Sequence, residues 1–154
     1  MEGGYRSKAI RGQGQLSVFL FPGEKTPKLM ETKRRVILAD DEKHIRALMK
    51  AVISSLNCEI AGEAADGQEA VDLYKKEKPD LLLLDVNMPQ KSGIDALREI
   101  MREFPDAVII MLTSVVDMEN IKQCIELGAA NYIRKDTSVT EMRQIIKDLL
   151  EGTN

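Results

Sequence analysis

The chain has 154 residues, of which 44% are hydrophobic and 31% charged, and it contains no tryptophan. These values predict one globular domain with a mostly aliphatic core. The longest apolar runs are about six residues, whereas a membrane helix needs roughly 20, so we expect a cytoplasmic protein. The two cysteines, Cys58 and Cys124, form no CxxC pair and are expected to be buried free thiols.

The charge is uneven along the chain. Residues 1–35 hold eight lysines and arginines against three acidic residues, a net +5, and residues 36–154 hold 14 against 22, a net −8. A domain that is this acidic has no electrostatic attraction for nucleic acid. We therefore expect no direct DNA binding by this chain and no membrane contact.

Residues 1–33 differ from the rest in being rich in glycine, proline and basic residues. We interpret them as a flexible basic leader or a non-native extension, with a domain over residues 34–152. Met30 is an alternative biological start. The apolar run Leu16–Phe21 could form an added edge strand or contact a partner, because short apolar runs are ambiguous.

From Arg35 onward, apolar runs alternate with amphipathic stretches. The runs predict strands over 36–39, 58–64, 81–84, 107–112 and 131–134. Apolar residues at helical spacing predict helices over about 45–56, 67–78, 92–104, 118–127 and 138–151. The third to fifth helices are expected to turn one stripe inward: Ile94, Leu97, Met101, Phe104; Met118, Ile121, Cys124, Ile125; Met142, Ile145, Ile146, Leu149.

Local signals mark several helix ends. Ser92 with Asp95, and Ser138 with Glu141, have the spacing of a capping box at a helix start. Pro79 and Gly128 are typical of positions just beyond a helix end.

Five strand–helix units predict an α/β, doubly wound, flavodoxin-like (βα)5 fold. Fully apolar strands between helices indicate a parallel sheet that is covered on both faces. Right-handed crossovers and five strands favour the strand order 2-1-3-4-5, in which the functional site lies at the carboxyl ends of the strands.

Polar residues follow four of these strands. Asp40 and Asp41 follow the first, Asp85 ends the third, Thr113 follows the fourth, and Lys135 comes just after the fifth. Each has an ordinary explanation alone, such as a helix cap or a surface charge. Their coincidence at one edge of the sheet instead predicts a site of three carboxylates, a hydroxyl and an ammonium.

Three neighbouring carboxylates need a compensating charge, and their oxygen ligands suit Mg²⁺, which also binds phosphoryl oxygens. Lys135 and Thr113 would neutralise the other oxygens of a phosphoryl group in transfer. The carboxylate in the middle of the edge, Asp85, is then the natural nucleophile.

Four segments carry a family resemblance. They are residues 36–42 with Asp40-Asp41-Glu42, residues 81–93 around Asp85, residues 111–114, and residues 128–135 ending in Lys135. In this order and at this spacing, they make the chain resemble a CheY-like response-regulator receiver domain of two-component signal transduction, across residues 34–150.

The resemblance implies roles for individual positions. It implies that Asp85 accepts a phosphoryl group, and that Lys135 contacts a phosphoryl oxygen. It implies Mg²⁺ (or Mn²⁺) bound by the side chains of Asp41 and Asp85 and by the backbone carbonyl of Asn87, with Asp40 acting through a water. Two further residues are implied as switch residues: Thr113 and Tyr132.

The resemblance also implies partners. The phosphoryl donor would be a sensor histidine kinase or a phosphotransfer protein. A downstream protein or effector domain would bind the face made by the fourth helix, the fifth strand and the fifth helix. The chain would be a regulatory phospho-acceptor and not an enzyme, with only incidental autophosphorylation and slow autodephosphorylation, working alone or as a piece of a longer regulator.

One position departs from the family pattern, because Asp136 stands where many receivers have a proline after the lysine, in a cis bond. The isomer of the Lys135–Asp136 bond is therefore left open. Val115, next to the path of attacking water, is expected to slow hydrolysis.

Other classes were weighed. A haloacid-dehalogenase phosphatase would need an acid where Asn87 stands, and a flavodoxin-like nucleotide binder would need a phosphate loop in place of Asp40-Asp41. A degenerate interaction module without phosphorylation is disfavoured by the intact set of site residues.

Overall fold

The computed structural model describes residues 15–19, 28–114 and 117–152. Seven strands and five helices follow one another in this part of the chain: β1 (Gln15–Phe19), β2 (Lys28–Thr32), β3 (Arg35–Ala39), α1 (Lys43–Ser55), β4 (Glu59–Ala64), α2 (Gly67–Glu77), β5 (Leu81–Asp85), α3 (Gly93–Glu103), β6 (Ile109–Thr113), α4 (Met118–Glu126), β7 (Asn131–Arg134) and α5 (Val139–Glu151).

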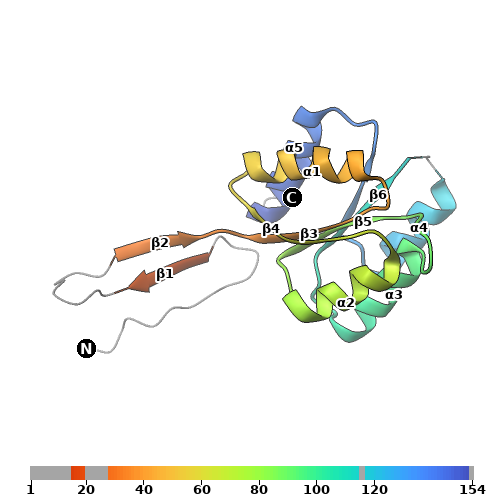
Figure 1. Ribbon diagram of the computed structural model, residues 1–154, viewed down its shortest axis with the longest axis horizontal. Coiled ribbons are helices and arrows are strands. Elements are labelled where there is room, and N and C mark those ends of the chain that lie inside the picture. Colours follow the sequence, from red (N-terminus) through yellow and green to blue (C-terminus); the bar gives the residue numbers. More distant parts are fainter. Residues whose placement is uncertain (1–14, 20–27, 115–116, 153–154) are drawn as a thin grey trace.

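Five parallel strands form the central sheet, in the spatial order β4-β3-β5-β6-β7. Counted from β3, this is the order 2-1-3-4-5, so the predicted doubly wound fold is confirmed. Helices cover both faces of the sheet (Figure 1). As is usual for parallel strands, the fully buried β5 and β6 read as continuous apolar runs.

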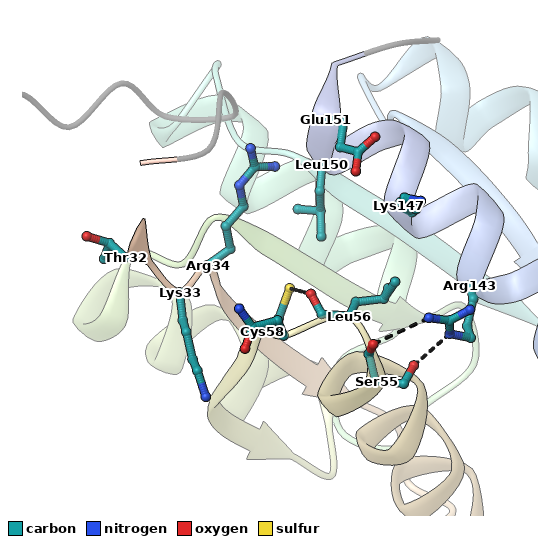
Figure 2. Close-up of a pocket in the computed structure, with 11 residues that line it drawn as sticks. Thr32, Lys33, Arg34, Ser55, Leu56, Cys58, Arg143, Lys147, Leu150 and Glu151 are labelled. Carbon is teal, nitrogen blue, oxygen red and sulfur yellow. Dashed lines mark hydrogen bonds between the residues drawn. The ribbon is translucent and has the colours of Figure 1, made fainter. Parts of the chain in front are cut away.

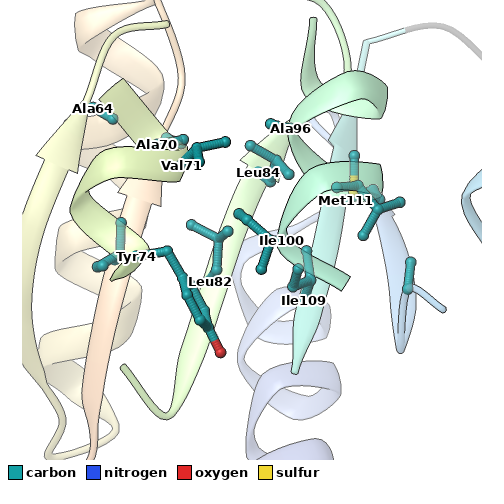
Figure 3. Packing of buried hydrophobic residues seen from close by; sticks show 14 of the residues in the cluster. Ala64, Ala70, Val71, Tyr74, Leu82, Leu84, Ala96, Ile100, Ile109 and Met111 are labelled. Carbon is teal, nitrogen blue, oxygen red and sulfur yellow. The ribbon is translucent and has the colours of Figure 1, made fainter. Parts of the chain in front are cut away.

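Side chains alternate between the two faces of each central strand. Ile37, Leu82 and Ile109 pack with α2 and α3 in one cluster, part of which Figure 3 shows. Val36 and Leu83, one residue away in their strands, pack with α1 and α5 in the second cluster. The period of two along each strand thus divides one apolar run between two cores.

The predicted helix starts are present. The side chains of Ser92 and Ser138 accept hydrogen bonds from the backbone amides of Asp95 and Glu141, and Asp66 caps α2 in the same way. These caps satisfy amides that have no partner within their own helix, and so fix where each helix begins.

The inward stripe predicted for α4 is partly wrong. Cys124 is buried, but Met118 and Ile125 are 68% and 47% exposed. Each residue of a helix turns about 100° from the last, so Met118 and Ile125, seven apart, share a side that lies far from Cys124. The spacing of Met118 and Ile125 is helical, but the side of α4 that faces the sheet is the one that carries Cys124.

Residues 15–32 hold an antiparallel pair of strands. β1 pairs with β2 in a sheet of its own, with Ser17 opposite Met30, and β2 leads into β3 after two residues (Figure 1). The strand expected within 16–21 thus occurs over 15–19 but is not an edge strand of the central sheet. The rest of the predicted leader, and Val115, lie outside the described residues.

Candidate functional site

The strand ends bring the predicted site residues to one edge of the sheet. Asp40 directly follows β3 and Asp85 is the last residue of β5, where Ala39 and Leu84 are register partners. Thr113 ends β6, and Lys135 follows β7, its backbone amide donating to the carbonyl of Thr113 at 2.8 Å. Parallel register therefore carries distant segments to the same rim.

Three carboxylates meet at this rim. Oxygens of Asp40, Asp41 and Asp85 lie within 4.8 Å of one another. Asp40 and Asp85 are only 1% and 3% exposed, whereas Asp41 is exposed. Carboxylates alone, one of them open to solvent, form the kind of donor set that fits a hard cation such as Mg²⁺.

Lys135 supplies the positive charge opposite these acids. Its Nζ lies 2.9 Å from Asp40 Oδ2, 3.2 Å from Asp85 Oδ2 and 2.7 Å from Glu42 Oε1, and its side chain is 9% exposed. Burial by itself would lower the pKa of Lys135. Hydrogen bonds to Glu42 and Asp40, with the charges of Asp85 and Asp40, outweigh burial and raise that pKa, so the ammonium stays charged.

Asp85 is electrostatically unusual. Its pKa is raised to about 7, first by burial and then by repulsion from Asp40. Lys135 and the backbone amide of Asn87, 3.3 Å from Asp85 Oδ1, oppose the shift without cancelling it. The carboxyl group therefore changes charge near neutral pH, and a cation bound beside it would favour the ionised form.

Glu42 also belongs to the acidic site, where no role was predicted for it from the sequence. Its side chain holds Lys135, and this hydrogen bond lowers the pKa of Glu42. Its backbone amide donates to Asp40 Oδ1 at 2.8 Å. The available signal was its place directly after the acidic pair, at the N-cap of α1, which points it to the same rim.

Arg46 also contacts the site from α1 and was missed. Its Nη1 donates to the backbone carbonyl of Asp40 at 2.5 Å, and its Nε lies 2.9 Å from Glu63 of β4. It ties the start of the acidic segment to the neighbouring strand. An arginine one turn into a helix is so common that no sequence signal distinguishes this one.

The turn after Asp85 packs closely against the strand. A Cβ atom on Gly93 would lie 1.8 Å from the backbone carbonyl oxygen of Asp85, and the Gly93 amide donates to the Val86 carbonyl at 2.8 Å. Glycine is therefore required here for space and not for a positive φ.

Thr113 and Tyr132, the two predicted switch residues, line the same small cavity, of about 10 Å³. Thr113 is buried, and Tyr132 is 37% exposed. The cavity lies between β6, β7 and α4, with Ile121 and Cys124 on its helical side. The cavity therefore lies between Thr113 at the strand ends and the side of α4 that faces the sheet.

The bond between Lys135 and Asp136 is trans, since no cis peptide occurs among the described residues. The question left open by the sequence is answered, and Lys135 reaches the acidic cluster with this isomer.

The sequence profile of the "Response regulator receiver domain" matches residues 36–147, which is most of the chain. The chain belongs to the response regulator receiver family. The matched residues run from β3 into α5, so the receiver includes every residue of the acidic site.

Several relatives resemble this receiver over nearly their whole length. It is 40% identical to Protein CcdB of Bacillus subtilis over 75% of this chain and 97% of that protein. It is 39% identical to the chemotaxis protein CheY of Thermotoga maritima over 66% of this chain and 85% of that protein. The acidic cluster of this receiver fits a Mg²⁺ site.

Other relatives are longer. The receiver is 38% identical to the transcriptional regulatory protein YxjL of Bacillus subtilis over 78% of this chain, but it spans only 56% of YxjL. Among solved structures, it resembles the CheX–CheY–BeF3–Mg²⁺ complex of Borrelia burgdorferi at 30% identity, with a TM-score of 0.71 over 73% of this chain and 86% of that one. This chain therefore covers some relatives almost completely and only about half of others.

None of the helices in the described part of this receiver has the length and apolar character needed to span a bilayer.

Proposed function

We propose that this receiver takes a phosphoryl group onto Asp85 from a phosphohistidine of a sensor kinase or phosphotransfer protein, with the help of Mg²⁺. The observation that carries the proposal is the meeting of Asp40, Asp41 and Asp85 within 4.8 Å, with the Lys135 ammonium against two of them. Buried charges in this arrangement are costly for stability and are typical of functional sites.

The residues available for the metal are those of the rim. Asp41 and Asp85 would bind Mg²⁺ (or Mn²⁺) by their side chains and Asn87 by its backbone carbonyl, while Asp40 would act through a water. The bound ion would supply charge neutralisation for the phosphoryl oxygens. Asp41 is the exposed member and Asp85 the buried one, so the set faces both solvent and the strand end.

Asp85 would act as the nucleophile. Its ionised oxygen would form the new bond to phosphorus as the bond from phosphorus to the donor imidazole nitrogen breaks and that nitrogen keeps the electron pair. Lys135, which now contacts Asp85 Oδ2, would move its contact to a phosphoryl oxygen, and the Thr113 hydroxyl would donate to another.

The signal would leave the site through Thr113 and Tyr132. Because both line the cavity under α4, a shift of Thr113 toward the phosphoryl group would leave room for the half-exposed Tyr132 ring to move inward. Phosphorylation shifts the population between two states only by its differential affinity for them.

The surface that would respond is the face of α4, β7 and α5. Four large apolar side chains are exposed there: Met118, Ile125, Tyr132 and Val139. Exposed large apolar side chains on neighbouring elements are typical of a partner surface. A downstream protein or an effector domain would bind this face.

The unit that performs this function would be residues 34–152, located in the cytoplasm, without catalytic turnover beyond autophosphorylation and slow loss of the phosphoryl group. It would not bind DNA itself. The relatives leave room for a receiver that works alone and for one that is joined to an output domain.

A direct test is to incubate the protein with Mg²⁺ and acetyl phosphate and to measure its intact mass. We expect one added phosphoryl group in the wild type and in Asp106→Asn, a matched change at an exposed position far from the rim, and none in Asp85→Asn. Removal of Mg²⁺ with EDTA should also abolish the adduct. Equal labelling of wild type and Asp85→Asn would refute the assignment.

A further inference from the structure

A second hollow lies at the opposite edge of the sheet, where the strands begin. It has a volume of about 430 Å³ and lies between the segment before β3, the end of α1 and the last turns of α5 (Figure 2). This volume is within the range of small-ligand pockets. The site around Asp85 is at the other end of the same strands, so the two are separate.

Cations dominate the lining of this pocket. Lys33, Arg34, Arg143 and Lys147 contribute four positive charges, against one acidic side chain, Glu151. The surrounding domain is strongly acidic, with a net −8 over residues 36–154. A concave basic spot on an acidic domain concentrates small anions locally.

One of these cations is already used within the protein. Arg143 donates to the Ser55 hydroxyl at 2.7 Å and to the Ser55 carbonyl at 3.3 Å, at the C-terminal end of α1 (Figure 2). A cation is favourable at this end of a helix, so Arg143 needs no ligand to explain it.

Arg34 has no such explanation. It is 9% exposed, and its Nη1 is buried without a hydrogen-bond partner in the part of the chain that the structure describes. Burial raises the pKa of the nearby Cys58 thiol, the charge of Asp80 adds to the rise, and the charges of Arg34 and Lys33 oppose it, so both cations act on a group that lines the pocket. A buried guanidinium nitrogen without a partner is costly, and an anion that accepted from it would remove this cost.

The helix ends beside the pocket do not fill this need. The α1 carbonyls accept from the Leu56 and Asn57 amides, and the Leu149 carbonyl at the end of α5 accepts from the Gly152 amide at 3.2 Å. Arg34 stands before β3 and takes no part in these contacts. Among the described residues, its charge is therefore left without a partner that would account for it.

We propose that this pocket binds a small organic anion. An oxyanion group, phosphate or carboxylate, accepts from Arg34 and pairs with Lys147, because a guanidinium matches the geometry of both groups. A compact apolar part lies against Leu56, Cys58 and Leu150, which form the apolar portion of the lining. Such a ligand connects α1, α5 and the entry to β3, at the far end of the domain from Asp85.

The test is an amide NMR titration of the full chain without Mg²⁺, using phenyl phosphate, benzoate and inorganic phosphate. We expect saturable shifts at amides of the pocket, around Asn57 and Glu151, and weaker binding of inorganic phosphate, which lacks the apolar part. The tighter of phenyl phosphate and benzoate identifies the preferred oxyanion. Saturation should occur in the millimolar range or below.

Variants separate this site from general charge attraction. Arg34→Met should weaken binding about tenfold or more, because it removes a charged hydrogen-bond donor. Lys147→Gln, at an exposed position that folding does not require, should weaken it about threefold. Lys76→Gln, an equal charge change on α2 across the sheet, should leave binding unchanged.

Three results would overturn the proposal. The first is the absence of saturable binding by all three probes below about 10 mM. The second is an affinity that is the same in wild type, Arg34→Met and Lys147→Gln. The third is a set of shifts that is confined to the Asp85 edge. Circular dichroism tests whether each variant is folded. If Arg34→Met is not folded, the affinity of Lys147→Gln compared with that of the wild type tests the proposal.

Discussion

The two edges of the central sheet handle charge in opposite ways. At the edge where the strands end, Asp40, Asp85 and Lys135 are nearly buried and contact one another directly. At the edge where the strands begin, Arg34 is buried beside a cavity of about 430 Å³ and has a nitrogen without a partner.

This difference teaches how one fold can hold two kinds of site. The acidic edge is closely packed, and Lys135 offsets part of its negative charge, which leaves an excess that a bound cation would offset. The basic edge is open, and its pocket has room for a small ligand that would pair with the unmatched positive charge. We therefore expect the acidic edge to be sensitive to substitutions that add atoms, and the basic edge to substitutions that remove a charge.

The largest expected effect comes from adding one methyl group at the acidic edge. Gly93→Ala would place a Cβ against the backbone carbonyl oxygen of Asp85, and backbone atoms cannot move aside as a flexible side chain can. We expect a loss of about 4 kcal/mol or more in the free energy of unfolding, measured by urea denaturation.

The matched change at the basic edge is Gly152→Ala, at the C-cap of α5. Gly152 has a φ of 69°, in the left-handed region, so alanine is strained there. We expect a cost of only about 1 kcal/mol. Similar costs at the two glycines would break the contrast between a packed and an open edge.

A smaller effect concerns the charge of Asp85 itself. The pKa of Asp85 is about 7 in the folded protein and 3.8 in the unfolded chain, so the folded state keeps the Asp85 proton to a higher pH. Metal-free wild type should therefore lose stability between about pH 4 and pH 7, and the loss is complete above that window. Asp85→Asn has no such charge, so at pH 8 it should be roughly 3 kcal/mol more stable by urea denaturation.

Mg²⁺ provides the control for this pH effect. The ion should stabilise the wild type at pH 8, by about 1.4 kcal/mol at ten times its dissociation constant, and should stabilise Asp85→Asn much less. If Asp85→Asn and wild type have the same stability at pH 8 without metal, the buried carboxyl is not the source of strain at this edge.

The smallest expected effect is at Glu42, which shares Lys135 with the two buried acids. Glu42→Gln keeps the size of the side chain, frees the ammonium for a phosphoryl oxygen, and removes a negative charge near an anionic donor. We expect phosphorylation by acetyl phosphate to be about threefold faster, measured as the initial rate of adduct formation.

Glu126→Gln is the matched control for Glu42, since it removes the same charge from an exposed position on α4. It should leave the rate unchanged. A slower rate in Glu42→Gln would mean that Glu42 positions Lys135 productively and does not compete for it.

The sequence predicted the fold because its strongest signals are local and repeated. The apolar runs around Ile37 and Leu83 have the length of buried strands, and Ser92 and Ser138 mark helix starts that the structure confirms. The strand order followed from general rules of chirality, and with it came the meeting of Asp40, Asp85 and Lys135.

What the sequence could not predict depends on three-dimensional packing. Helical spacing alone could not show that Cys124 faces the sheet while Met118 and Ile125 face solvent. The contact of Glu42 with Lys135 joins residues 93 apart, and the pocket at Arg34 depends on where α5 ends. Neither leaves a periodic trace in the sequence.

The position of Lys135 after the final strand has a consequence for biosynthesis. Ribosomes make the three aspartates first, so any folding that brings them together before residue 135 is made does so without the cation that offsets their repulsion. The edge can reach its finished electrostatic balance only when β7 has paired with β6, because only then does Lys135 lie against Asp40 and Asp85.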